Sequence, residues 1–210
     1  GLKALEAGDW ETADRLAARY VPQWANRLLK LAGVTVTVEG KENIPAGRAC
    51  VFAGNHRSYY DIPLMLTQLD APHGLVAKKE IAGLPLVRGW MRLLHCVFLD
   101  REAPRKAMAA LNEAIENLKK GYSIAIFPEG TRNKGEEGTL QEFKGGAFRI
   151  ATKAKAPVVP VAITGSRDIM ENNHMWMHPA HVTIRILPPI ETEGLTREEI
   201  KALPERTAEA

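Results

Sequence analysis

Short apolar runs rich in β-branched residues alternate with amphipathic stretches along most of the chain, and this alternation restricts the fold more than any other feature. The runs that predict strands are 34–40, 48–55, 74–80, 95–101, 123–130, 156–166 and 181–190. The stretches that predict helices are 59–69, 84–94, 104–120, 147–154 and a segment after Leu195. Such alternation is typical of α/β domains, so we expect a mixed sheet flanked by helices, with the functional site at strand ends.

Length and composition fit one globular domain, expected at 33–210 after an N-terminal segment at 1–32. With 45% hydrophobic and 25% charged residues, the 210-residue chain is no disordered tail, collagen-like rod or disulfide scaffold. A formal net charge of +3 is too small to indicate nucleic-acid binding. Cys50 and Cys96 lie in apolar runs, so we expect core thiols in a reduced, intracellular protein.

The sequence contains no candidate for a transmembrane span. No run reaches about 18 apolar residues, and no signal peptide is visible. The first residue is Gly1 rather than Met, which favours a trimmed or partial chain. A membrane anchor in the natural protein is therefore not excluded.

The N-terminal segment, 1–32, is predicted to be helical and amphipathic. Trp10, Tyr20 and Trp24 recur at roughly helical spacing, and basic residues occur among and after them, namely Arg15, Arg19, Arg27 and Lys30. Pro22 is expected to kink or divide the helix. Two interpretations are open on these residues alone: a helix in a membrane interface, or an ordinary amphipathic helix that covers the sheet.

Polar clusters follow three of the predicted strands, at 55–61, 99–101 and 128–132. Open α/β sheets collect their functional sites at the carboxyl ends of strands. Three independent strand ends that carry His, Asp, Glu and Arg therefore indicate one site more strongly than any single cluster does.

The first cluster contains His56 and Asp61, which are five residues apart and so do not share one face of a continuous helix. If His56 lies in the turn and Asp61 in the first helical turn, the carboxylate reaches the imidazole Nδ1. Ser58 would then cap the helix, and Pro63 suits an early helical position. This contact would leave Nε2 free to act as a base. The alternative is a turn histidine beside an aspartate that only favours the helix N-terminus.

Positive side chains also leave strand ends, namely Lys78, Arg101 and Arg132. Convergent guanidinium and ammonium groups are what a phosphate requires, and Gly130 would let backbone N–H groups approach an anion. The alternative is that each is a solvated surface charge.

Metal and nucleotide sites have little support. His174, His178 and His181 are spaced by four and three residues, but Pro179 interrupts a helix and no carboxylate lies between them. Neither a Gly-x-Gly-x-x-Gly motif nor a P-loop lysine pattern is present. We therefore expect no metal and no cofactor.

Four blocks together resemble the glycerolipid acyltransferase family, specifically its bacterial 1-acylglycerol-3-phosphate acyltransferases. The blocks are 55–61 (NHRSYYD, with the H-x4-D motif), 97–101 (VFLDR), 127–132 (FPEGTR) and 158–161 (VVPV). Their order and spacing agree over about residues 34–190. The third block usually continues with Ser where this chain has Asn133, which is a slight departure.

The resemblance implies transfer of a fatty acyl group from acyl-CoA or acyl-carrier protein to the sn-2 hydroxyl of 1-acyl-glycerol-3-phosphate, giving phosphatidic acid. His56 would take the hydroxyl proton, and Asp61 would orient it. The residues implied at the acceptor and its phosphate are Glu129, Gly130, Thr131, Arg132, Arg101 and Lys78. The residues implied as supporting members of the first block are Asn55, Arg57 and Ser58.

The implied chemistry is direct transfer without an acyl-enzyme, because no Gly-x-Ser-x-Gly elbow is present. Attack on a thioester develops an oxyanion, so backbone donors near the turn are expected to contribute to the rate.

The implied substrates carry long acyl chains, which favours the membrane-facing interpretation of 1–32. A second apolar contact is expected from Met170, Met175, Trp176 and Met177. We expect a location at the cytoplasmic face of the cell membrane, peripheral or anchored by a segment absent from this chain. Two alternatives are acylation of glycerol-3-phosphate or another lysophospholipid, and a non-catalytic peripheral lipid-binding module. The intact His56–Asp61 pair argues against the lipid-binding module, because a protein that only binds lipid needs no base.

Overall fold

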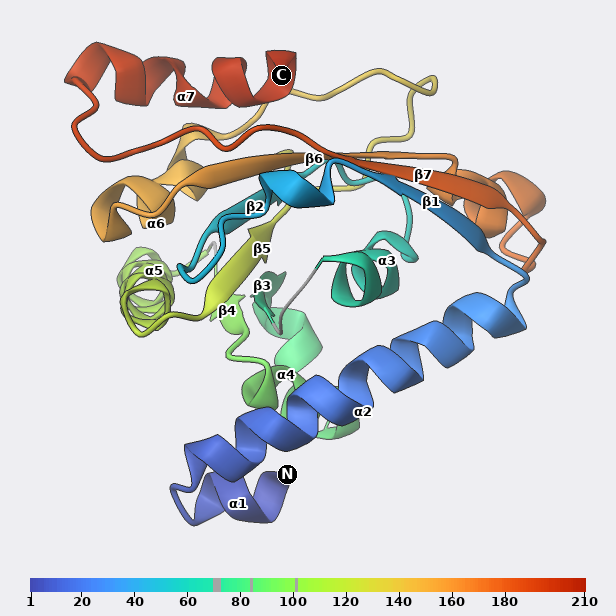
Figure 1. Cartoon of the computed structure of the whole chain (residues 1–210), viewed down its shortest axis with the longest axis horizontal. Coiled ribbons are helices and arrows are strands. Elements are labelled where there is room, and N and C mark those ends of the chain that lie inside the picture. Colours follow the sequence, from blue (N-terminus) through green and yellow to red (C-terminus); the bar gives the residue numbers. More distant parts are fainter. Residues whose placement is uncertain (70–72, 84, 101) are drawn as a thin grey trace.

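The computed structural model describes residues 1–69, 73–83, 85–100 and 102–210. A seven-stranded sheet in the order β1-β7-β6-β2-β5-β3-β4 forms its centre (Figure 1). The strands are β1 (Thr35–Glu39), β2 (Val51–Gly54), β3 (His73–Lys78), β4 (Val97–Leu99), β5 (Ser123–Ile126), β6 (Val158–Thr164) and β7 (His181–Ile186). Adjacent strands are parallel except for the antiparallel pair β6–β7, so the predicted mixed sheet is confirmed.

The direction of the strands brings the polar segments together. Strands β6, β2, β5, β3 and β4 all run the same way, so their carboxyl ends lie along one edge of the sheet. Strand β2 lies between β5 and β6. The chain that leaves these three neighbouring strands is therefore gathered at one place.

Helices cover both faces of the sheet (Figure 1). The helices are α1 (Leu2–Glu6), α2 (Trp10–Leu31), α3 (Asp61–Gln68), α4 (Pro85–Leu93), α5 (Pro104–Lys119), α6 (Gly145–Ala154) and α7 (Arg197–Glu209). Side chains of β2 alternate between the faces: Phe52 packs in the cluster with α2 and α3, while Val51 and Ala53 pack in the cluster with α5 and α6. The fully buried strand therefore supplies both halves of the core.

Helix α2 lies along the α3 and α4 side and buries one residue in every four. The buried residues are Ala13, Ala17, Val21, Ala25 and Leu29. The predicted division at Pro22 is wrong, because α2 continues through it and the break in the segment comes at Gly8, with φ +73°. The carbonyl that Pro22 leaves without its helical donor belongs to Ala18, which is exposed, so water can satisfy it.

A polar cluster fixes the first part of α2 against the rest of the protein. Asp14 accepts from Tyr122 Oη at 2.8 Å and lies 2.8 Å from His95 Nε2. The His95 ring stacks on Tyr122 and on Trp10, with centroids 3.7 and 5.2 Å away.

Within the described ranges, no helix is long and apolar enough to cross a bilayer.

Both cysteines are free and buried, as predicted from their apolar surroundings. Burial raises the pKa of the Cys50 thiol to about 11 and that of Cys96 to about 12. Both thiols are therefore protonated at neutral pH and are poor nucleophiles.

Candidate active site

The turn after β2 carries the predicted His–Asp contact. His56 Nδ1 lies 2.9 Å from Asp61 Oδ2, and the imidazole stacks on Phe127 with centroids 4.1 Å apart. The Asp61 side chain is 0% exposed, whereas that of His56 keeps 17% exposure. Solvent, or a substrate, can therefore reach the imidazole but not the carboxylate behind it.

Asp61 also organises the turn in front of its own helix. Its Oδ2 accepts from the backbone N–H groups of Arg57 and Ser58, at 2.7 and 2.8 Å. The prediction that Ser58 caps α3 is wrong: Tyr60 occupies that position, and no side chain caps the helix. Because the Asp61 carboxylate folds back to these N–H groups, the Ser58 hydroxyl is left to accept from the Tyr60 N–H at 3.1 Å.

Four successive backbone N–H groups, those of residues 56–59, donate to three carboxylates from different parts of the fold. Glu129, after β5, accepts the first at 2.8 Å, and Asp61 accepts the second and third. Glu171, after β6, accepts the fourth at 2.8 Å. These N–H groups are therefore engaged, and the expectation of oxyanion donors near the turn does not hold for 56–59.

Glu129 is 1% exposed, and both of its oxygens serve the backbone. Besides the His56 N–H, it accepts the N–H of Gln141 at 2.9 Å. This geometry favours a role for Glu129 in holding the turn rather than in contacting an acceptor. Gly130 has φ +75°, a conformation that glycine adopts without strain, and its N–H donates to the Phe127 carbonyl at 2.9 Å.

Arg132 extends from the same loop back over the turn. Its Cζ lies 3.5 Å from the centroid of the Tyr59 ring, and its Nη1 lies 3.6 Å from Glu171 Oε1. The side chain is 31% exposed, so part of the guanidinium remains open to an anion. Thr131 is exposed beside it.

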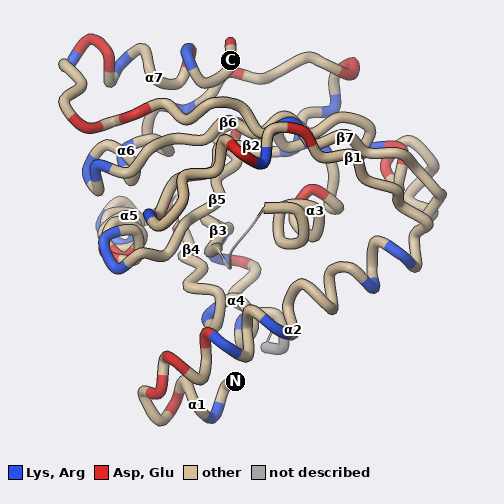
Figure 2. Tube along the Cα trace, viewed as in Figure 1, with Lys and Arg blue, Asp and Glu red and all other residues tan. Residues whose placement is uncertain are grey.

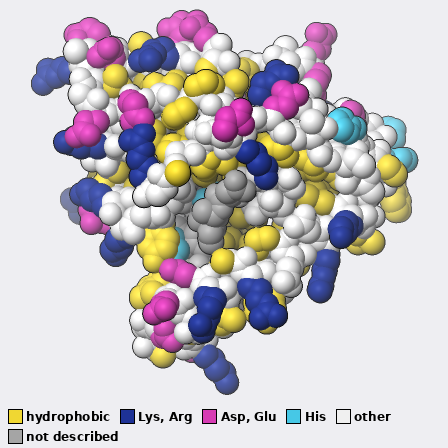
Figure 3. Space-filling model, in the orientation of Figure 1, with side chains coloured by type: hydrophobic (Ala, Val, Ile, Leu, Met, Phe, Trp, Pro, Cys, Tyr) yellow, Lys and Arg dark blue, Asp and Glu magenta, His cyan; other side chains and the backbone are white. Residues whose placement is uncertain are grey.

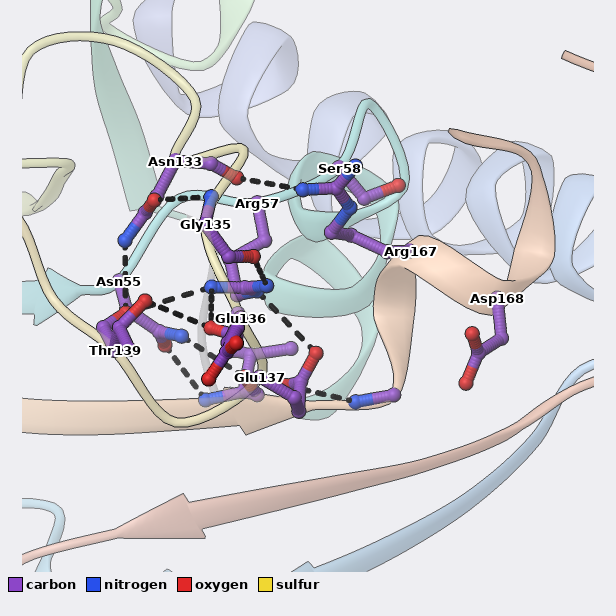
Figure 4. Close-up of polar contacts among 12 residues, drawn as sticks. Asn55, Arg57, Ser58, Asn133, Gly135, Glu136, Glu137, Thr139, Arg167 and Asp168 are labelled. Carbon is purple, nitrogen blue, oxygen red and sulfur yellow. Dashed lines mark hydrogen bonds and ion pairs between the residues drawn. The ribbon is translucent and has the colours of Figure 1, made fainter. Parts of the chain in front are cut away.

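Arg57 fastens the 133–139 loop (Figure 4). This side chain is only 3% exposed. It donates to the carbonyls of Gly135 at 2.7 Å and Glu136 at 3.0 Å, and its Nε lies 3.3 Å from Glu137 Oε2. The first sequence block is thereby tied to the loop that follows the third block.

Two asparagines stabilise the same region. Asn133 donates its N–H to the His56 carbonyl at 2.7 Å, and its Oδ1 accepts the Gly135 N–H at 2.8 Å. Asn55 bonds the backbone of Ile163 in β6, donating at 2.9 Å and accepting at 2.7 Å. The Asn-x-Gly order at 133–135 is a local turn signal that the sequence analysis did not use.

Of the predicted phosphate-binding cations, Arg132 is the one for which the described part of the chain shows contacts with the His56 turn and its partners. Lys78 is exposed at the end of β3, and no contact between it and the His56 turn is among those that the structure describes. Its neighbour Lys79 bonds Asp100 at 3.0 Å, which lowers the pKa of that carboxyl. Strand β5 separates β3 and β4 from β2. Arg101 lies outside the described residues.

The segment after β6 supplies Glu171, which the sequence analysis missed, and Met177, which it expected only as an apolar contact. Glu171 accepts from Ser58 Oγ at 2.8 Å, and Met177 Sδ lies 3.0 Å from the Tyr60 hydroxyl. Burial, followed by the nearby Glu171 carboxylate, raises the pKa of Tyr60. The contact between 59 and 171 spans 112 positions, so no local pattern could have revealed it.

The histidines considered for a metal are dispersed. His181 lies in β7, where its ring nitrogens are 3.1 and 3.2 Å from the hydroxyls of Thr35 and Thr37. His174 follows a short 3-10 helix in a left-handed conformation, with φ +53°. Among the described residues, no group of three or more His, Cys, Asp or Glu side chains is placed to hold a metal ion.

The known proteins to which this chain is similar include acyltransferases. The family model described as Acyltransferase matches residues 35–164. The 1-acyl-sn-glycerol-3-phosphate acyltransferase of Saccharomyces cerevisiae is 34% identical over 199 residues, which are 91% of this chain and 65% of that protein. The protein of the same name from Borreliella burgdorferi is 32% identical over 81% of this chain and 68% of its own length. The present chain therefore spans just under two thirds of the yeast protein.

A solved structure supports the same assignment. The crystal structure of the 1-acyl-sn-glycerophosphate (LPA) acyltransferase PlsC from Thermotoga maritima matches with a TM-score of 0.79 and 33% identity. The match covers 95% of this chain and 81% of that chain. The family resemblance inferred from the sequence blocks is confirmed: this chain belongs to the acyltransferase family.

Proposed function

We propose that the chain transfers a fatty acyl group from acyl-CoA or acyl-carrier protein to the sn-2 hydroxyl of 1-acyl-glycerol-3-phosphate, giving phosphatidic acid. The names of its relatives support the acceptor. The observation that carries the proposal is the 2.9 Å contact between His56 Nδ1 and the buried Asp61 carboxylate. With its proton on Nδ1, the ring presents an unprotonated Nε2 to the exposed side, as a general base requires.

In the proposed reaction, the acceptor hydroxyl oxygen attacks the thioester carbonyl carbon while its proton passes to His56 Nε2. The tetrahedral intermediate collapses, the carbon–sulfur bond breaks, and the thiolate takes the proton from Nε2. Asp61 keeps the ring in position and stabilises the imidazolium between these two transfers. No acyl group is attached to the protein, in keeping with the buried, protonated thiols of Cys50 and Cys96.

Arg132 is the described cation best placed for the acceptor phosphate, since it lies over Tyr59 on the turn that carries His56. Lys78 and Arg101 remain proposed as secondary contacts of the phosphate. Gly130 and Thr131 remain proposed as residues that line the acceptor site. Glu129, Asn55, Arg57 and Ser58 are proposed to hold the turn and its loop rather than to touch the substrate.

The function is tested with purified protein in detergent or vesicles, by mass analysis of the product. The acceptors are lysophosphatidic acid, glycerol-3-phosphate and other lysophospholipids, and the donors are acyl-CoA and acyl-carrier protein. We expect phosphatidic acid from lysophosphatidic acid. If the protein prefers glycerol-3-phosphate or another lysophospholipid, that compound would replace lysophosphatidic acid as the proposed acceptor. Lipid binding without any turnover would favour the non-catalytic lipid-binding module.

Replacing Arg132 with alanine is expected to lower kcat/KM for lysophosphatidic acid by about 5- to 150-fold, or about 1–3 kcal/mol, because a charged hydrogen-bond partner of the phosphate is lost. The measurement compares the variant on lysophosphatidic acid and on an uncharged monoacylglycerol. An equal loss on both acceptors would contradict a phosphate-binding role.

We also propose that the N-terminal segment rests on the membrane, with the reaction at the cytoplasmic face, where both thioester donors are found. Lysine and arginine positions recur along α2 (Figure 2). Its exposed residues include Arg19, Tyr20, Trp24, Arg27 and Lys30, and no acidic residue occurs between Arg15 and Leu31. In the space-filling view, basic and hydrophobic side chains adjoin one another over this helix (Figure 3). This pattern suits a surface of anionic lipid.

Replacing Trp24, which is 54% exposed, with alanine is expected to reduce binding to phosphatidylglycerol vesicles by about tenfold, because a large apolar group no longer enters the interface. Vesicle sedimentation measures the effect. Ile200, 39% exposed on α7, is the control, and its replacement with alanine should leave binding unchanged. Equal losses from the two variants would refute a specific role for α2.

A further inference from the structure

Glu171 lies in the segment between β6 and β7, outside all four sequence blocks, yet its carboxylate contacts the turn that carries His56. Its side chain is 11% exposed. Oε2 accepts from the Ser58 hydroxyl and Oε1 from the Tyr59 N–H, both at 2.8 Å. The Ser58 side chain is itself completely buried. Such bonds to a charged acceptor are strong, and they fix the turn from the side opposite Glu129.

The same carboxylate also faces the proposed phosphate ligand. Arg132 is held between the Tyr59 ring, 3.5 Å from its Cζ, and Glu171 Oε1, 3.6 Å from its Nη1. An arginine that is free in solvent samples many rotamers, whereas a stacked and paired one has a defined direction. Of the three carboxylates that accept from residues 56–59, only Glu171 pairs with an arginine in the described part of the chain.

We propose that Glu171 is a positioning residue that joins acceptor binding to the catalytic turn. It aims the Arg132 guanidinium at the acceptor phosphate and holds Ser58 and Tyr59 in place. It acts through these groups and does not itself touch the reacting atoms. The inference rests on the proposed acyl transfer to a phosphate-bearing acceptor.

The test is a double-mutant cycle of Glu171→Gln and Arg132→Ala, with KM measured separately for lysophosphatidic acid and the thioester donor. Glutamine keeps an acceptor for the Tyr59 N–H, and its amide can donate to Ser58 Oγ, so the turn is retained while the charge that orients Arg132 is lost. We expect the lysophosphatidic acid KM to rise about fivefold, a typical effect of losing a partly exposed ion pair, with kcat and the donor KM nearly unchanged.

In the Arg132→Ala background, Glu171→Gln should produce no further rise, because the group through which it acts is gone. Additive effects, equal rises in the two KM values, or a lower KM for lysophosphatidic acid would overturn the proposal. A lower KM would mean that the carboxylate only competes with the phosphate. Asp168→Asn is the matched control: it removes a negative charge from the same segment at an exposed position, and no kinetic change is expected.

Failure of the proposed function is distinguishable from failure of this inference. If the wild-type protein acylates no acceptor, the proposed function is wrong. The inference about Glu171 is then tested by the dissociation constants of lysophosphatidic acid and monoacylglycerol in mixed micelles. Loss of preference for lysophosphatidic acid in Glu171→Gln, but not in Asp168→Asn, supports the positioning of Arg132. An unchanged preference refutes it.

Discussion

Replacing His56 with alanine is expected to lower kcat by about 10²- to 10⁴-fold, the usual contribution of a general base, while lipid binding stays within about twofold. The backbone bonds that hold the turn run from N–H groups to the carboxylates of Glu129, Asp61 and Glu171, and alanine keeps all of them. Only the imidazole is removed, so the variant separates chemistry from folding and from substrate binding. Steady-state turnover and vesicle or micelle binding provide the two measurements.

The matched control is His178→Ala, because His178 is exposed and its described bond uses the backbone N–H alone, to the Ile169 carbonyl. That variant should keep wild-type turnover. Persistent activity in His56→Ala would refute the general-base mechanism. If neither the wild type nor the variant turns over but both bind lipid, the chain is a lipid-binding module.

Replacing Asp61 with asparagine is expected to lower kcat by about 10²- to 10³-fold and to reduce the free energy of unfolding by about 1–3 kcal/mol. The amide oxygen can still accept from Arg57 and Ser58, but the charge that stabilises the imidazolium is lost. The amide nitrogen would also take the place of Oδ1, a buried atom with no hydrogen-bond partner in the described structure. Turnover and the denaturation midpoint should therefore both fall.

A second His–Asp pair in the same chain provides the control for Asp61→Asn. Asp14 lies 2.8 Å from His95 in the cluster that fixes α2. Asp14→Asn is expected to lower stability without changing kcat, since this pair lies outside the site. A loss of stability with unchanged kcat in Asp61→Asn as well would assign Asp61 a structural role alone.

Local pattern was enough to predict the elements, and it offered the central pair as one of two interpretations. Every predicted strand and helix overlaps an observed one, because periodicity of side chains is a property of adjacent residues. The five positions from His56 to Asp61 allowed either a contact or a turn histidine beside an unrelated helix-terminal aspartate, and the structure shows the contact. Of the two effects expected at Pro22, a kink or a division of the helix, the division is wrong. It depended on whether the carbonyl that loses its donor would be buried or exposed.

The contacts of the remaining site residues could not be predicted from their neighbours in the sequence. Glu129 was expected at the acceptor, but its carboxylate turns inward to backbone N–H groups. The expectation placed Lys78 near the phosphate, yet Lys79, one position along, makes the described contacts at that strand end. Lys78 is the last residue of β3 and Lys79 the first of the 3-10 helix that follows, so the exact end of the strand decides which cation meets which partner.

The sequence by itself determined the α/β class and the blocks that identify the family, because each depends on residues close together in the chain. It offered the His–Asp pair as one of two interpretations of the turn. Only the tertiary structure decided which carboxylates surround the turn at residues 56–59 and that Glu171 meets Arg132 there. Those contacts depend on β2 lying between β5 and β6. Strand order is set by packing of the whole core, so residues far apart in sequence become neighbours only once the sheet is assembled.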